Sequence, residues 1–189
     1  MTGAAVYESM VNDLEQLLTD VAERFREGDL EGAAQRVSVL FSPPYVDEWR
    51  PHARRSITKV RMKLEAKYGR LLSERTLFMR GVYTLCHSII YSIARHLGFS
   101  PFVGNKIALV AAGAAHVVYV YLSRGWRETA YASVVMQATS LKEGFGIPYT
   151  VAFKMVTLAA AIAFYLIKNP SPVEELYYEV KKIPQQTLK

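Results

Sequence analysis

Residues 98–125 read GFSPFVGNKIALVAAGAAHVVYVYLSRG, and this stretch carries the signals that decide the fold class. Gly98 is a typical left-handed stop for a helix that precedes it. Ser100 and Pro101 follow in the order of an N-cap and a first-turn proline, so a new helix is expected from Pro101. From Ile107 to Leu122 the stretch has no formal charge and is rich in Ala, Gly and Val. These features predict a helix whose small side chains let neighbouring helices approach closely.

The chain shows the same helical periodicity on both sides of this stretch. Apolar residues recur at spacings of three and four from Val6 to Phe25, and Gly28 follows as a stop. Asp29 can cap a short second helix, which is expected to run through Phe41. Further helices are expected at about residues 51–68, 73–97, 101–122, 127–141, 148–168 and 173–183.

The sequence contains no alternating strand pattern of useful length and no internal repeat. The fold class is therefore predicted as all-α, a helical bundle core with an extended basic N-terminal helical arm. Residues 1–72 are expected to form this arm, acidic first and then basic. Residues 73–189 are expected to form an apolar C-terminal helical bundle. With 189 residues, of which 51% are hydrophobic, the chain is large and apolar enough to bury a core, which excludes wholesale disorder.

Two segments are apolar enough to raise the question of a membrane. Residues 107–122 carry no charge, and residues 149–167 carry only Lys154. About twenty apolar residues suffice to span a bilayer, so three alternatives are open: a buried core or subunit interface, contact with a lipid envelope, and a true span. Lys154 and the Ala-rich centre of the second segment favour the buried alternative. So much apolar surface in a small chain also indicates oligomerisation.

The charges are sorted along the chain. From Arg50 to Arg80, ten Lys and Arg residues face two carboxylates, Glu65 and Glu74, so this block carries +8. Residues 1–49 carry −7 and residues 81–189 carry +5. A block of one sign usually indicates a partner of the other sign, and a polyanion is the first candidate. The alternative is an ordinary solvated helix face.

The spacing within the basic block favours nucleic acid. Four cations, Arg55, Lys59, Lys63 and Lys67, follow one another at i, i+4 on one side of the expected helix, where like charges repel each other. Such a row can follow phosphates and bind them without reading the base sequence. The predicted DNA-binding residues are Arg50, Arg54, Arg55, Lys59, Arg61, Lys63, Lys67, Arg70, Arg75 and Arg80. If about eight phosphates are engaged, log K should fall with log salt at a slope of about −7.

Signals for catalysis and for cofactors are weak. The single cysteine, Cys86, excludes an internal disulfide framework and a cysteine-based zinc site. No HExxH, Walker or GxGxxG motif is present, and we expect no catalytic residue, no metal site and no cofactor. Arg80 and His87 stand in an R-x6-H spacing, which resembles the active-site motif of HEPN-type helical ribonucleases. Two unrelated residues on one helix face would give the same spacing.

The segment from Ser73 to Glu143 resembles the helical core of major capsid proteins from filamentous viruses of hyperthermophilic archaea (rudivirus, lipothrixvirus and tristromavirus types). The resemblance rests on Arg95-x-x-Gly98-x-x-Pro101-x-x-x-Asn105 and on the small-residue helix after it. It continues through the run YVYLSRG at residues 119–125 and through the helix after Glu128. It covers little more than a third of the chain.

The resemblance implies a structural protein with no enzymatic activity. In that family a C-terminal helical bundle lies outside, and N-terminal helices wrap double-stranded DNA held in A-form. The subunits pair with themselves or with a paralogous capsid subunit, and some virions have a lipid envelope. The expected location is thus the virion, assembled in the host cytoplasm. The acidic first helix and the extra apolar helix after Pro148 fit the enveloped, two-protein type better than the simplest rods.

Two rival functions stay open at this point. One is a HEPN-like ribonuclease or toxin that uses Arg80 and His87. The other is a membrane-associated protein whose basic block is drawn to anionic lipid. Within the leading hypothesis, the acidic residues 8–31 are expected to contact the basic arm of a neighbouring subunit, because the charges are opposite.

Overall fold

The computed structural model of this chain describes residues 3–68 and 74–182, and across these ranges it contains helices and no strand. The predicted all-α class is confirmed. The elements are α1 (Gly3–Arg26), α2 (Leu30–Val37), the 3-10 helix η1 (Ser38–Phe41), α3 (Tyr45–Tyr68), α4 (Glu74–His96), α5 (Pro101–Ser123), α6 (Arg127–Phe145), α7 (Tyr149–Lys168) and α8 (Ser171–Lys181).

The helix boundaries follow the local signals where the sequence carries them. Asp29 caps α2, because its Oδ1 accepts the Gly32 N–H at 2.8 Å. Ser100 caps α5 by accepting the Val103 N–H at 3.3 Å, with Pro101 in the first turn. Gly98 ends the preceding helix at a φ of +86°, a conformation that favours glycine. The stops and restarts predicted at these positions are confirmed.

The second predicted helix is α-helical only over Leu30–Val37, and Ser38–Phe41 form the 3-10 helix η1. Two further predicted boundaries, at α3 and α6, are wrong. Helix α3 begins at Tyr45, six residues before the predicted start at Pro51, and keeps this proline in its interior. The additional turn is anchored by Trp49, which is buried and donates its indole N–H to the Leu40 carbonyl at 2.7 Å. This tertiary contact offsets the backbone hydrogen bond that a proline cannot donate. Helix α6 likewise continues to Phe145, four residues beyond its predicted end.

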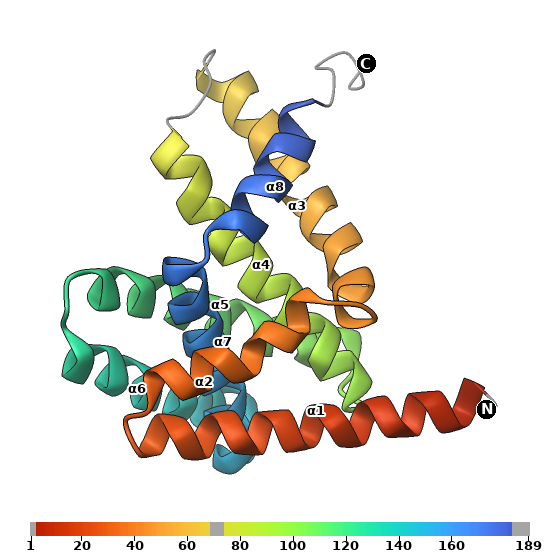
Figure 1. The fold of residues 1–189 in the computed structure, drawn as a ribbon, viewed down its shortest axis with the longest axis vertical. Helices are drawn as coiled ribbons and strands as arrows, with labels where there is room; N and C mark the ends of the chain where they lie inside the picture. Colours follow the sequence, from red (N-terminus) through yellow and green to blue (C-terminus); the bar gives the residue numbers. More distant parts are fainter. Residues whose placement is uncertain (1–2, 69–73, 183–189) are drawn as a thin grey trace.

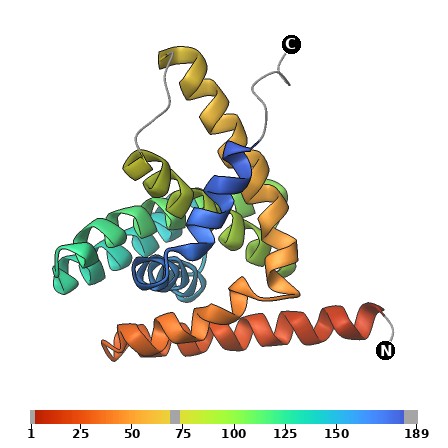
Figure 2. The ribbon, with the colours of Figure 1, turned by 45° about the horizontal axis from the view of Figure 1, so that its top comes forward.

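Helix α7 is the centre of the bundle. Of its 20 residues 13 are buried, and it lies against α1, α2, α5 and α6. Figure 2 shows it nearly end-on above α1. Its single internal charge, Lys154, donates from Nζ to the Thr19 hydroxyl of α1 at 2.8 Å, so the ammonium is held at the α1 contact.

Two described helices, α5 and α7, are long and apolar enough to cross a membrane. For α7 the apolar window is 72% buried inside the bundle, which fits the buried-core alternative. The window in α5 is only 39% buried, and Phe102 and Leu109 on this helix are exposed. A subunit interface and a lipid contact therefore stay as predictions for the exposed side of α5.

The molecule narrows toward one end. Helix α1 lies across the base in Figure 1, while α3, the N-terminal half of α4 and α8 rise at the opposite end. We call this end the upper lobe. The predicted boundary between residues 72 and 73 falls in residues 69–73, outside the described residues. Buried residues of α1, α2 and α3 belong to the same hydrophobic cluster as those of α4 to α8.

Candidate nucleic-acid interface

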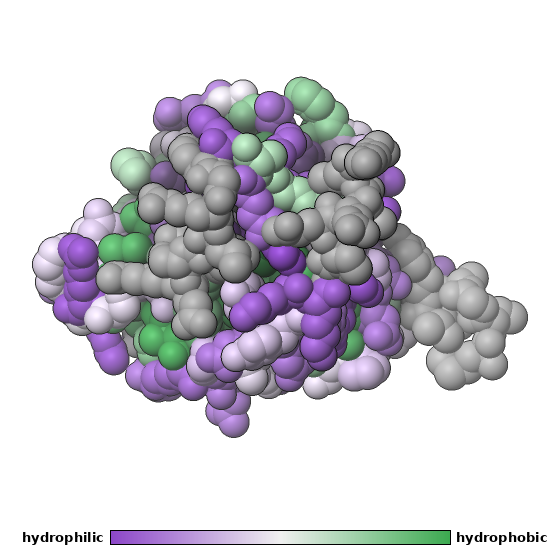
Figure 3. Space-filling model, turned by 90° about the horizontal axis from the view of Figure 1, so that it is seen from above, coloured by the Kyte–Doolittle hydropathy of each residue, from purple (hydrophilic) through white to green (hydrophobic). Residues whose placement is uncertain are grey.

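The candidate interface lies on α3, which has one buried side and a broad exposed side. Trp49, Ala53 and Ile57 are buried and face the rest of the fold. Their spacing of four residues leaves a narrow apolar seam, so most of the helix surface is available to solvent or to a partner. Seen from above, the described side chains at this end of the molecule are largely hydrophilic (Figure 3).

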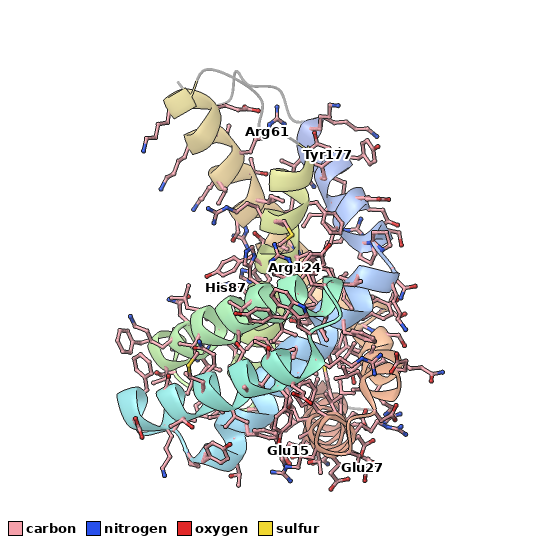
Figure 4. The ribbon with its side chains drawn as sticks, turned by 90° about the vertical axis from the view of Figure 1, so that its left-hand side faces the viewer. Glu15, Glu27, Arg61, His87, Arg124 and Tyr177 are labelled. Atoms are coloured by element: carbon pink, nitrogen blue, oxygen red, sulfur yellow. The ribbon has the colours of Figure 1, made fainter. Side chains whose placement is uncertain are left out.

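The exposed side of α3 carries a row of cations. Arg54, Arg55, Lys59 and Lys63 are all exposed, and Lys67 is exposed at the next position of the row. Arg55, Lys59 and Lys63 are each one helical turn apart, about 6 Å along the axis. In Figure 4, nitrogen-tipped side chains of α3 project from the same side of the molecule on which His87 lies.

An open hollow of about 730 Å³ follows this side of α3. Its lining residues are Asp47, Arg50, Pro51, Arg54, Arg55, Thr58, Lys59 and Glu179. Four of these are cations from α3, and one of the two acids, Glu179, comes from α8. The surface is therefore hollowed along the helix that carries the positive block, with acidic residues at its edge.

Two of the predicted DNA-binding residues are engaged within the molecule. Arg50 pairs with Glu179 and lies 3.7 Å from a carboxylate oxygen of Glu175. Arg61 bonds Glu65 at 2.7 Å and donates to the Val180 carbonyl at 2.5 Å. The side chains of Arg61 and Glu65 are only 11% and 13% exposed. Both arginines lie on the flank of α3 that faces α8.

The remaining predicted residues divide between described and undescribed parts of the chain. Arg70 and the side chain of Arg75 lie outside the described residues. Arg80 is exposed on α4. Burial, and to a smaller extent the charge of Arg80, lower the pKa of His116 on α5. Six of the ten predicted residues are thus exposed in the described part of the chain: Arg54, Arg55, Lys59, Lys63, Lys67 and Arg80.

The sequence reasoning missed the acidic residues of α8. Glu175 and Glu179 lie more than 120 positions after Arg50, so no sequence signal near the basic block indicates that they contact it. Their i, i+4 spacing on a predicted amphipathic helix is a signal that places them on one face. That signal does not say which helix they meet, because the meeting depends on how α8 packs.

A strip of rings on α4 lies beside the row of cations. His87 is stacked between Tyr83 and Tyr91, with ring centroids 6.4 Å apart on each side. His52 of α3 meets Tyr91 edge-on at 6.1 Å. Burial lowers the pKa of His87, whose Nε2 lies 3.2 Å from the Asn105 side-chain oxygen. The half-buried imidazole is therefore favoured in its neutral form.

The ribonuclease alternative needs Arg80 and His87 to act on one phosphate. They share a face of α4 but lie seven residues apart, which is about two helical turns. The His87 imidazole is directed to Asn105, and the field of Arg80 acts on His116. Each of these two residues thus interacts with a residue of α5, and the ribonuclease alternative stays a prediction.

No metal or thiol chemistry emerges from the described side chains. Among them, no group of three His, Cys, Asp or Glu residues is close enough to hold a metal ion. Cys86 is buried, and burial raises the pKa of its thiol to about 12. The thiol is thus uncharged at neutral pH, and it packs as a small apolar side chain.

Comparison with protein-family models, with curated proteins and with solved structures gives no match for this chain. The resemblance of residues 73–143 to archaeal capsid proteins stays a prediction. The case for a function therefore depends on the surface of α3 and on its surroundings.

Proposed function

We propose that this chain is a structural protein that binds double-stranded DNA without sequence preference, as a capsid subunit of a helical filamentous virion. The observation that carries the proposal is the row of exposed cations, Arg55, Lys59 and Lys63, along one side of α3. Like charges one turn apart destabilise an isolated helix, and an array of phosphates would offset that repulsion. Phosphate contacts position a protein on a duplex but carry no base information, as packaging a whole genome requires.

Exposed apolar side chains support a role in an assembly. Phe102 is 69% exposed and Met136 is 59% exposed, and Trp126 and Phe145 are also exposed. Aromatic residues and Met are enriched in protein–protein interfaces relative to the rest of the surface. They suit contacts with further copies of the chain, with a paralogous capsid subunit or with a lipid envelope, as the resemblance implies.

The distribution of charge also suits contacts between copies. Glu15 and Glu27 of α1 lie at the base of the molecule, whereas Arg61 of α3 lies at the top (Figure 4). Glu15 and Glu27 are thus far from Arg61 within one chain, whereas Asp13 of α1 lines one hollow with Tyr45 at the start of α3. A contact of Glu15 or Glu27 with the cationic row of α3 would therefore join two subunits. Asp20 of α1 already bonds Arg36 at 2.5 Å, so Glu15 and Glu23 are the better residues to test. Neutralising them should loosen assembly, while unchanged assembly would refute the contact.

The DNA contact can be tested by the salt dependence of binding. If the six exposed cations each meet a phosphate, log K for a duplex should fall with log salt at a slope of about −5. The triple variant Arg55→Gln, Lys59→Gln, Lys63→Gln should make the slope less steep by about three. It should also weaken binding to every duplex sequence equally. Fluorescence anisotropy with labelled duplexes between low and physiological salt measures both quantities.

A matched control removes three exposed cations elsewhere. The control variant combines Arg124→Gln, Arg127→Gln and Lys142→Gln, at the α5–α6 turn and on α6. Its salt slope should lie within about one unit of the wild-type slope. A slope near −1 for the wild-type protein would refute the phosphate row.

Electron microscopy of the protein mixed with double-stranded DNA, with any paralogous partner present, tests the assembly. Filaments of constant width are expected, and circular dichroism of the DNA in them tests the A-form implied by the resemblance.

A further inference from the structure

We propose that α8 limits the DNA affinity of α3 by holding Arg50 in ion pairs with Glu175 and Glu179. This inference rests on the proposed function, since it concerns the same surface. It assigns a role to two acids that no motif in the sequence singles out. In this role they compete with phosphate for one cation of the interface.

Helix α8 is held in place by apolar contacts. Val173, Leu176 and Val180 are buried at spacings of three and four, and the helix packs on α4 and α3. At Gly81 of α4, an added Cβ would lie 2.5 Å from Val173 Cγ1, so this glycine permits the close approach of α8. The acids of α8 therefore reach α3 from a fixed position.

Two arginines of the basic block, Arg50 and Arg61, make polar contacts with α8. Arg50 pairs with Glu179 and lies 3.7 Å from Glu175, and Arg61 donates to the Val180 carbonyl at 2.5 Å. Glu179 also lines the hollow that contains Arg54, Arg55 and Lys59. Any phosphate in that hollow would be close to a carboxylate.

The competition follows from ordinary electrostatics. Glu175 and Glu179 both approach Nη2 of Arg50 and neutralise its charge, so a phosphate that comes to this guanidinium is repelled by two carboxylates. Bound DNA must therefore displace the acids or bind Arg50 weakly. The two acids also repel any phosphate that comes within about a Debye length of them, about 10 Å at 0.1 M salt. Arg50 is 39% exposed, and a pair exposed to that degree is weak enough to exchange partners.

The test is an increase in DNA affinity when the acids are neutralised. The double variant Glu175→Gln, Glu179→Gln should bind a duplex about threefold to tenfold more tightly near physiological salt. Its salt slope should be steeper by about one, because Arg50 becomes available to a phosphate. Glu174→Gln is the matched control, since Glu174 is exposed on the same helix and belongs to neither ion pair of Arg50.

A second background separates a local effect from a general change of charge. In the Arg50→Gln protein, neutralising Glu175 and Glu179 should no longer steepen the slope. The inference is overturned if the double variant binds like Glu174→Gln, or if the slope steepens equally in the Arg50→Gln background. Thermal unfolding of each variant shows whether α8 remains packed.

Failure of this inference can be told apart from failure of the proposed function. If the triple variant of α3 binds DNA as well as the wild type, the proposed function is wrong and the α8 result carries no weight. The other outcome is that the triple variant of α3 loses affinity while the double variant Glu175→Gln, Glu179→Gln binds DNA like Glu174→Gln. In that case the DNA-binding surface is supported, and only the competition by Glu175 and Glu179 is refuted.

Discussion

Helices α3 and α7 have similar lengths, 24 and 20 residues, and opposite relations to the fold. Helix α7 is buried over 13 residues and carries one internal charge, Lys154. Helix α3 buries a thin seam and exposes cations on its other sides. A buried helix stabilises the fold by removing apolar surface from water, whereas an exposed row of like charges destabilises it slightly. The contrast indicates that α7 serves stability, and the exposed cations are the reason for proposing that α3 serves binding.

The largest effect should come from a cavity in α7. Leu158 is fully buried, and Leu158→Ala should lower the free energy of unfolding by about 2–5 kcal/mol, because it removes apolar contacts and leaves a void. Denaturant unfolding measures this. On α3, Lys59→Ala should change stability by less than about 0.5 kcal/mol. Similar losses for both variants would break the contrast between the two helices.

The start of α3 is the exception that sharpens the comparison. The indole of Trp49 is buried and bonds the Leu40 carbonyl, so Trp49→Phe should cost about 1–3 kcal/mol by leaving that carbonyl unpaired. The other tryptophan, Trp126, is 50% exposed, and Trp126→Phe is the matched control with an expected change below about 0.5 kcal/mol. Equal effects in thermal or urea unfolding would mean that Trp49 does not anchor α3.

Two glycines test how tightly α8 is held against the upper lobe. Gly81→Ala should destabilise the fold by about 1–3 kcal/mol, because the added methyl overlaps Val173. Gly104→Ala meets its nearest neighbour, the Ala94 Cβ, at 3.5 Å, an ordinary contact, so helix propensity should make it neutral or stabilising by about 0.5–1 kcal/mol. If the two variants unfold alike, α8 does not pack closely at Gly81.

The smallest effect concerns pH. Burial lowers the pKa of His87 below its ordinary value of 6.5, so the unfolded chain takes up this proton at a higher pH than the folded chain. Stability should therefore fall as the pH drops below about 6.5, and His87→Gln should remove part of that loss. Urea unfolding at pH 7.5 and pH 5 measures the difference. An unchanged pH dependence in His87→Gln would show that this imidazole is not desolvated by the fold.

Much of the architecture could be predicted from local signals. Asp29, Gly98 and Ser100 act within one turn of the chain, so the boundaries that depend on them are confirmed. The start of α3 could not be read in this way, because Trp49 bonds Leu40 across the break at residues 42–44 and outweighs the proline signal. Whether an apolar helix is buried in the fold also depends on tertiary contacts. Hydropathy alone cannot separate a buried helix from a spanning one, and the burial of α7 depends on the helices packed around it.

The candidate site also combines features that follow from the local sequence with features that depend on packing. The amino-acid sequence by itself determined the helices, the i, i+4 row of cations and the concentration of positive charge between Arg50 and Arg80, because these depend on residues within a few turns of one another. The tertiary structure alone decided which cations face solvent. Packing of Val173, Leu176 and Val180 brings Glu175 and Glu179 to Arg50 and a backbone carbonyl to Arg61, while Lys59 and Lys63 stay exposed. Ion pairing needs proximity in space, and only the packed fold supplies that proximity for residues so far apart in the chain.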